Sequence, residues 1–229
     1  MIGIIGAMSI ETEAIIRELQ KAEECTVSGV RFVKGNWSGT EVVVATSGVG
    51  KVFAALCAEA MILKYQPECI INSGVAGALD PALHLLNVVI GEDVVQHDMD
   101  TSPLGDPRGL LSGIDQVSLP ADQRLNAAFE KAAAGLEIPA LRGRVASGDQ
   151  FIASDEKRND VRNTFGAACC EMEGAAIGHV CYVNEVPFAV LRAISDGAAG
   201  DAKMDYPAFA AKAAEQSIKI LKKAMEELR

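Results

Sequence analysis

The sequence predicts an α/β fold, a single domain with three layers, α/β/α, around a mixed, mostly parallel central sheet. Short apolar runs typical of buried strands alternate with longer segments of helical period, the order expected for a sheet covered by helices on both faces. The chain has 229 residues, of which 49% are hydrophobic, enough for one core of this size. No repeat or low-complexity segment marks a second domain, so residues 1–229 are expected to form one unit.

Each predicted strand is a short run of apolar or small side chains. The strands are expected at Ile2–Ile5, Val42–Thr46, Cys69–Asn72, Val88–Ile90, Gly143–Ser147, Ala167–Glu171 and Phe188–Ile194, with a further short one at Arg31–Val33. Helices are expected where apolar residues recur at helical spacing, at Ile10–Gln20, Val52–Tyr65, Asp122–Ala134, Asp155–Thr164, Gly174–Val183 and Pro207–Leu228. Asp205 can cap the last helix, and Pro207 suits its first turn. The stretch from about residue 98 to 120 has neither period, which predicts a lid or interface loop.

Composition excludes some partners. The formal net charge is −10 and the sequence pI is about 4.8, so nucleic acid is not expected as a ligand. No window reaches the roughly 18 apolar residues of a membrane span. The first residues lack a basic region and have the pattern of a strand, so we expect no signal peptide and a cytoplasmic location.

Neither cysteine nor histidine predicts a metal site. The six cysteines form no C-x-x-C pair and lie mostly in apolar runs, so we interpret them as reduced thiols of the core. The sole local cluster of hard ligands is His97, Asp98 and Asp100, which we interpret as a loop carrying solvated acids.

Charged residues follow or interrupt two of the apolar runs. Glu171 and Glu173 come directly after the run Gly166–Cys170, and in an extended chain they would share one face. Arg192 lies inside the most apolar run, where a buried guanidinium requires a carboxylate partner. Asp196 follows that run and is either a turn cap or a functional acid at the edge of the sheet, where open α/β folds bind ligands.

Three glycine-rich turns resemble phosphate loops without matching one. Gly48-Val49-Gly50 begins like a dinucleotide fingerprint, but its final small residue is replaced by Phe53. The turn 74–78 follows a strand and can bring backbone close to a ligand. Residues 105–108 lie in the long loop, and we interpret their likeness to a phosphate loop as a coincidence. The turns that end strands predict a ligand-facing backbone and do not identify phosphate.

Two other positions allow two interpretations each. Glu11 and Glu13 open the first helix, where acids interact favourably with the helix dipole, so Glu11 is either a helix-start residue or a catalytic one. Phe151 and Ile152 follow Ser147-Gly148-Asp149-Gln150 and are either a loop anchor or a platform for a flat base.

Six blocks together resemble one family in order and spacing, the bacterial 5′-methylthioadenosine/S-adenosylhomocysteine nucleosidases. The blocks are 3–8 with Glu11, 47–52, 72–77, 147–152, 171–173 and 192–196. The resemblance spans nearly the whole chain and implies a nucleoside phosphorylase-like fold. It also implies hydrolysis of the adenine–ribose N-glycosidic bond of 5′-methylthioadenosine and S-adenosylhomocysteine. No metal or organic cofactor is implied.

The resemblance also implies roles for particular residues. Asp196 would protonate or hydrogen-bond N7 of adenine, Glu11 would activate the water, and Arg192 would orient that water or Glu11. Glu173 would bind the ribose hydroxyls. The other implied substrate-binding residues are Met8, Val49, Val75, Gly77, Phe151, Ile152, Met172, Ser195 and Tyr206. A homodimer is implied, in which the segment from His97 through the long loop completes the site of the neighbouring subunit.

Departures from the family pattern leave the substrate open. Val75 stands where many relatives have serine, which removes one hydroxyl contact to water or ribose. The loop sequence 103–109 also differs. The preferred 5′-substituent is therefore open among methylthio, homocysteinyl, deoxy and 6-amino-6-deoxyfutalosine types.

Two rival functions would use the same fold. A phosphorylase on the same fold needs cationic residues around phosphate, and the early loop offers Met8 and Glu11 instead. A nucleoside sensor without turnover would not need both an acid and a water-activating base. We therefore expect a hydrolase.

Overall fold

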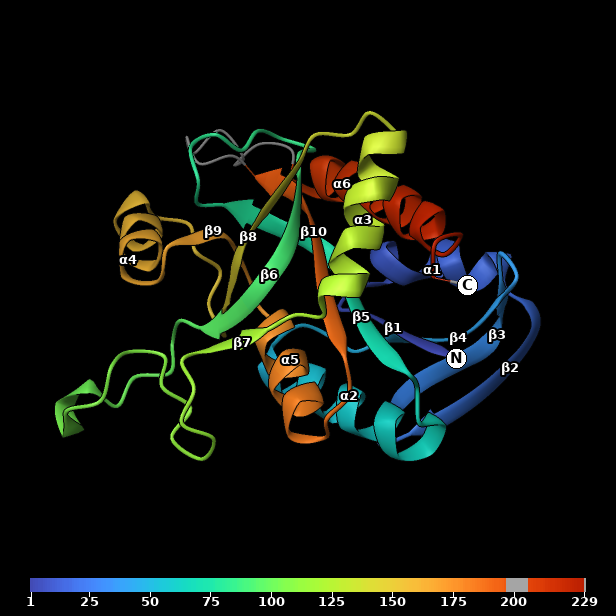
Figure 1. Ribbon diagram of the computed structural model, residues 1–229, viewed down its shortest axis with the longest axis horizontal. Helices are drawn as coiled ribbons and strands as arrows, with labels where there is room; N and C mark the ends of the chain where they lie inside the picture. The colour runs from blue at the N-terminus through green and yellow to red at the C-terminus, as the bar shows by residue number, and fades with distance from the viewer. Residues whose placement is uncertain (197–205, 229) are drawn as a thin grey trace.

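Among residues 1–196 and 206–228, which the computed structural model describes, ten strands pair into one mixed sheet (Figure 1). The strands are β1 (Ile2–Gly6), β2 (Gln20–Val27), β3 (Val30–Trp37), β4 (Thr40–Thr46), β5 (Cys69–Ala78), β6 (Val88–Gln96), β7 (Ser118–Pro120), β8 (Ala140–Ser147), β9 (Ala167–Glu171) and β10 (Phe188–Asp196). The α-helices are α1 (Ser9–Glu18), α2 (Lys51–Tyr65), α3 (Gln123–Gly135), α4 (Asp155–Phe165), α5 (Gly174–Val183) and α6 (Tyr206–Ala224). The expected α/β class with a mixed sheet is confirmed.

The sheet is parallel at its centre and curls at one end. β1 pairs in parallel with β4 and β5, and β5 pairs in parallel with β10. Beyond this centre the pairing runs from β10 through β6, β8 and β9 and returns to β5, so this part of the sheet closes on itself. The closing pair β5–β9 joins Gly77 to Cys170, which brings the ends of distant strands together.

Helices cover both faces of the sheet, as Figure 1 shows. On one face, α1, α3 and α6 bury side chains such as Ile15, Phe129 and Ile220. On the other, α2 and α5 bury Met61 and Ile177. Helix α4 packs apart from both, in a smaller cluster with β8, β9 and the loop before it. None of the helices in the described part of the chain is long and apolar enough to cross a membrane.

Several boundaries differ from prediction because polar strands lack a hydrophobic pattern. The first helix ends at Glu18, and Gln20, predicted to be helical, begins the edge strand β2. That strand carries Lys21, Glu23 and Glu24 and is exposed, as edges that resist further pairing usually are. In the predicted 98–120 loop, residues 102–104 form a short 3₁₀ helix, and Ser118–Pro120 forms β7 on β6.

The last helix also differs at its end. It begins at Tyr206, with Pro207 in its first turn as expected, and ends at Ala224 rather than Leu228. The predicted cap Asp205 lies outside the described residues.

Candidate active site

One cavity opens where β1, β5, β9 and β10 end, and it gathers the sequence blocks described above. Its empty space is about 570 Å³ when the open solvent at its mouth is included. Its walls are formed by Ala7, Met8, Glu11, Val49, Val75, Ala76, Gly77, Gln150, Phe151, Ile152, Cys170, Glu171, Met172, Glu173, Ser195 and Asp196. Every predicted site residue is among them except Arg192, which lies behind the wall, and Tyr206, whose side chain lies outside the described part.

Glu11 reaches the cavity from the first turn of α1. Its Oε2 accepts hydrogen bonds from the backbone N–H groups of Ala7 at 2.7 Å and Met8 at 2.9 Å. Its Oε1 accepts from the N–H of Val75, at 3.1 Å, across the cavity wall. Burial raises the pKa of Glu11, against the opposing charge of Arg192 and these backbone donors. The carboxyl group therefore holds the helix start, as one interpretation predicted, and it also lines the cavity, while its catalytic role stays a prediction.

Asp196 is the last residue of β10 and is buried at the cavity wall. The Ser195 hydroxyl donates to its Oδ1 at 3.1 Å, and Arg158 Nη2 lies 3.6 Å from its Oδ2. Burial raises the pKa of Asp196, although the Ser195 hydrogen bond and the charge of Arg158 both oppose this rise. A Cβ on Gly77 would lie 2.9 Å from Oδ2, so a side chain at this position would force the carboxyl group to shift.

Glu173 stands at the N-terminus of α5 and contacts the glycine turn before α2. Its Oε1 accepts from the N–H of Gly50 at 2.8 Å. The next N–H, of Lys51, donates to Asp149 Oδ1 at 2.7 Å, which ties the turn to the loop that carries Phe151. Burial, followed by the nearby charge of Glu171, raises the pKa of Glu173 to about 7. The turn thus lies at the cavity, and Val49 forms part of the wall.

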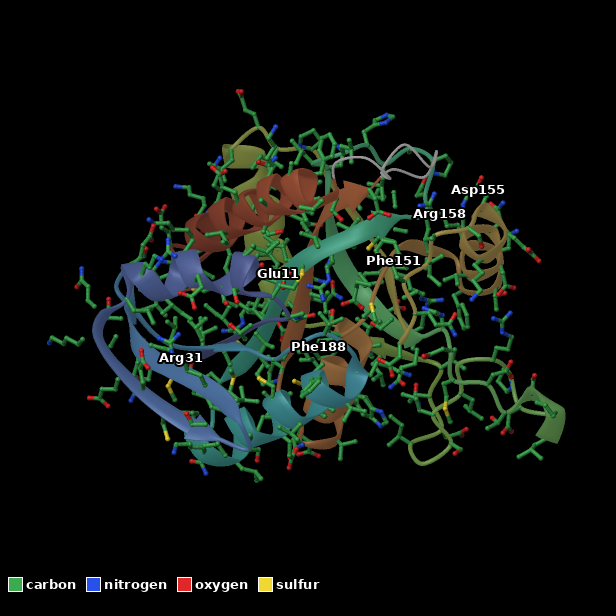
Figure 2. The ribbon with its side chains drawn as sticks, turned by 180° about the vertical axis from the view of Figure 1, so that it is seen from behind. Glu11, Arg31, Phe151, Asp155, Arg158 and Phe188 are labelled. Carbon is green, nitrogen blue, oxygen red and sulfur yellow. The ribbon has the colours of Figure 1, made fainter. Side chains whose placement is uncertain are left out.

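Phe151 and Ile152 are neighbours in sequence but differ in burial. The Phe151 side chain is 62% exposed at the cavity, whereas Ile152 is buried in the cluster beneath α4. Figure 2 shows Phe151 toward the α4 side of the molecule and Glu11 near α1, so they approach the cavity from different elements. A flat apolar ring at one end and carboxyl groups along the walls suit a ligand with a heterocyclic base and a polar sugar.

Arg192 is buried and paired with a carboxylate, as expected, while the orientation of the water or Glu11 by Arg192 stays a prediction. Its Nη2 donates to Glu171 Oε2 and to Asn72 Oδ1, and no hydrogen bond joins it to Glu11 among the described contacts. The required carboxylate partner is therefore Glu171. Glu171 and Glu173 both line the cavity, as their spacing predicted, but Glu171 is also held by Ser147 and by the N–H of Gly174 at 2.7 Å.

The residues of the wall that the predictions missed are mostly sequence neighbours of predicted ones. Ala7, Ala76 and Gln150 each adjoin a predicted site residue, and Cys170 directly precedes Glu171, so adjacency to a motif was the available signal. Arg158 is different. It lies among charged residues at the start of α4, and nothing in that pattern distinguishes it from a solvent-exposed arginine.

The cysteines are free thiols, and all but Cys25 are buried, as expected. The solvated-loop interpretation of the His97 cluster is wrong in part, because His97 is buried and Asp98 forms an ion pair with Lys51 at 2.6 Å. Arg108 pairs with Asp160 at 2.9 Å and is absent from the cavity wall, in agreement with the interpretation of residues 105–108 as coincidental.

Known proteins share both sequence and fold with the chain. The sequence profile of the phosphorylase superfamily matches residues 1–226. The 5′-methylthioadenosine/S-adenosylhomocysteine nucleosidase of Shewanella pealeana is 38% identical, with 99% of each chain covered. The nucleosidase of that name from Neisseria meningitidis, solved with methylthio-immucillin-A, has a TM-score of 0.94 at 31% identity and covers 99% and 98% of the two chains. The futalosine hydrolase of Helicobacter pylori has a TM-score of 0.93 at 36% identity and covers 99% and 97%.

Proposed function

Because the chain belongs to the phosphorylase superfamily, among its 5′-methylthioadenosine/S-adenosylhomocysteine nucleosidases, we propose that it hydrolyses the N-glycosidic bond of 5′-substituted adenine nucleosides. The products are adenine and the 5′-thioribose. Methylthioadenosine and S-adenosylhomocysteine are the principal substrates. 5′-Deoxyadenosine and 6-amino-6-deoxyfutalosine are further candidates, the latter supported by the likeness to a futalosine hydrolase.

The charge of the cavity wall is the observation that carries this proposal. Four acidic residues line the cavity, namely Glu11, Glu171, Glu173 and Asp196, and no lysine, arginine or histidine does so among the described residues. Carboxylates repel phosphate but stabilise the positive charge that develops on a ribosyl group as the bond breaks. Water is therefore the better nucleophile for this site than phosphate.

Asp196 is the general acid in this proposal. Adenine is a poor leaving group as an anion, so a proton or a strong hydrogen bond at N7 accelerates its departure, by about 10²–10⁴-fold for a positioned acid. An ordinary aspartate would be ionised at neutral pH. The burial that raises the pKa of Asp196 favours its protonated form.

The remaining residues hold the substrate and the water. Glu11 holds and deprotonates the water from the opposite face of the sugar, Glu173 binds the ribose hydroxyls, and Met172 packs beside the ribose. Phe151 stacks on adenine, and the backbone of Ile152 reads its edge. Met8, Val49 and Tyr206 surround the ribose and the 5′-substituent, while Val75 adds an apolar wall where a hydroxyl would offer a further polar contact. Arg192 acts through its charge, which opposes from beneath the wall the rise that burial gives the pKa of Glu11.

The protein also forms a homodimer in this proposal, with each site completed by the partner. Large apolar side chains are exposed together on the packed pair α2 and α5: Val52, Phe53, Leu56, Leu63, Tyr182 and Val183. Val49, which is half-exposed in the cavity wall, directly precedes this face. In Figure 1 the segment with the 3₁₀ helix at residues 102–104 extends away from the body, as an arm that contacts a second copy would.

Light scattering on the purified protein tests the dimer. The wild type is expected at twice the 24.1 kDa of one chain, and Val52→Glu at one chain. Leu136→Glu is the control, since Leu136 is also exposed but lies at the end of α3, outside this face. A monomeric wild type would overturn the dimer. The cytoplasm is the proposed location, because its reducing conditions keep thiols such as these in their free form.

Adenine release from methylthioadenosine, with and without phosphate in dialysed buffer, tests the reaction. Phosphate-independent release with free 5-methylthioribose is the expected result. Release that requires phosphate and gives a sugar 1-phosphate would make the protein a phosphorylase. Tight binding without release from any of the candidate nucleosides would make it a sensor. Comparing the four nucleosides by kcat/KM then ranks the 5′-substituents.

A further inference from the structure

Arg158 is a buried cation at the edge of the cavity that the proposed reaction does not use. It projects from the first turns of α4, and its side chain is 9% exposed. Its Nη2 lies 3.6 Å from Asp196 Oδ2, and its Nη1 lies 3.5 Å from Asp155 Oδ1 at the helix start. Figure 2 shows Arg158 and Asp155 together on α4, on the same side of the molecule as Phe151.

The surroundings of Asp196 make this contact unusual. Ser195 from β10 donates to Oδ1, Gly77 of β5 packs against the carboxyl group, and the Cys170 thiol faces it from β9. Arg158 is the one positively charged group that contacts Asp196 among the described residues. A general acid works in its protonated form, whereas a neighbouring guanidinium favours the ionised form. The contact therefore has a functional consequence that packing alone would not require.

We propose that Arg158 is a positioning residue for Asp196, holding Oδ2 from α4 and limiting the pH range over which Asp196 carries its proton. This rests on the proposed hydrolysis. Loss of the guanidinium leaves Ser195 as the polar partner of Asp196 among the described hydrogen bonds. The carboxyl group of Asp196 then takes up its proton at higher pH, and its position relative to the purine is less fixed.

Through helix α4, Arg158 connects Asp196 to Phe151 and Ile152, the residues proposed to contact the purine. Ser154 caps α4, accepting from the N–H of Lys157 at 3.3 Å, and Ser154 follows Phe151 and Ile152 closely in sequence. Ile152 packs in one cluster with Val161 and Phe165 of the same helix. The segment 151–152 and α4 therefore form one packed unit, and Arg158 joins this unit to β10. The position of Phe151, on which the purine would stack, and the position of Asp196 therefore both depend on α4.

The experiment compares Arg158→Met, Arg158→Lys and the control Arg162→Met. Methionine keeps an apolar stem without the charge, and lysine keeps the charge without the planar guanidinium group. Arg162 lies one turn further along the same helix, and no described ion pair joins it to Asp196. Two quantities are measured: the pH profile of kcat for methylthioadenosine hydrolysis, and the pKa of Asp196. The latter comes from ¹³C NMR of aspartate-labelled protein, assigned with Asp196→Asn.

In Arg158→Met the pKa of Asp196 and the alkaline limb of the kcat profile are expected to move upward together by about one pH unit or more. In Arg158→Lys both should stay within a few tenths of the wild-type values while kcat falls, because a point charge does not hold Oδ2 in one place. Arg162→Met should match the wild type in both. Unchanged titration and an unchanged profile in folded Arg158→Met would overturn the inference. If Arg158→Met does not fold, wild-type kcat in Arg158→Lys would overturn the positioning role.

The two proposals fail in different ways. If the wild type hydrolyses no nucleoside, the proposed function fails, and the NMR titration still decides whether Arg158 controls the protonation of Asp196. If hydrolysis is confirmed and the titration of Asp196 ignores Arg158, only this inference fails.

Discussion

Arg192, behind the cavity wall, forms a buried ion pair with Glu171, which is part of that wall. The guanidinium also donates to Asn72, and the same Glu171 oxygen accepts from the N–H of Gly174 at 2.7 Å, at the start of α5. Arg192 places a positive charge that opposes the rise in the pKa of Glu11 caused by burial, whereas at Glu173 the charge of Glu171, which raises the pKa, outweighs that of Arg192. Arg192 acts without presenting its cation to a ligand, because it is not part of the wall.

Removing either partner of this pair should destabilise the fold. Glu171→Gln and Arg192→Met are each expected to lower the free energy of unfolding by about 3–5 kcal/mol, because the remaining charge stays buried without its counterion. Urea unfolding measures this, and the double variant should lose less than the sum of the two. Arg108→Met is the control: its pair with Asp160 is largely exposed and is expected to contribute no more than about 1 kcal/mol. Single-variant losses no larger than this control would contradict the prediction.

Asp196→Asn should separate binding from chemistry. The amide keeps the size of the side chain but cannot donate a carboxylic proton, so turnover should fall by about 10²–10⁴-fold. Calorimetry with a non-hydrolysable adenine nucleoside analogue should show nearly unchanged affinity. Turnover at the wild-type rate would remove Asp196 from the role of acid.

Glu11→Gln should lose hydrolysis while the protein still folds. An amide cannot activate water, so the rate is expected to fall by about 10²-fold or more. The carboxylate accepts hydrogen bonds from three backbone N–H groups, and the NH₂ group of glutamine would face at least one of these donors. That donor would lose its acceptor, which costs about 1–3 kcal/mol of stability. Glu13→Gln is the matched control, because Glu13 is exposed and interacts with Arg31 at 3.4 Å. A fast but less stable Glu11→Gln enzyme would support the helix-start role alone.

Glu173 should make stability fall as pH rises through the weakly acidic range. Its pKa is raised from 4.5 to about 7 in the folded protein, so between these values the folded state holds a proton that the unfolded state has released. The contribution is fully present below about pH 4.5 and lost above about pH 7, with an upper bound of about 3 kcal/mol. Urea unfolding at pH 5 and pH 8 should show a smaller decrease in Glu173→Gln than in the wild type. Equal decreases would show that Glu173 titrates near its ordinary value.

Prediction from sequence succeeded where hydrophobic pattern and motif coincide. Gly174–Val183 was predicted with the observed boundaries, and Asp122 caps α3 through the N–H of Leu125 at 2.9 Å, as a helix-start residue should. It failed for β2, whose side chains are charged because the strand lies at an exposed edge. The predicted strand Cys69–Asn72 was also too short. The glycines that follow it have the pattern of a turn, but they continue β5 to Ala78, and Gly77 pairs with Asp196 of β10.

By itself, the sequence determined the α/β class, the helices and the identity of most residues in the cavity wall, because each of these leaves a local pattern of periodicity or motif. Only the tertiary structure decided which charges meet. It pairs Arg192 with Glu171, brings Arg158 from α4 to Asp196, and curls the sheet so that β9 closes on β5. These contacts join residues far apart in the chain, and their energies depend on distance and burial, which no spacing of residues along a sequence specifies.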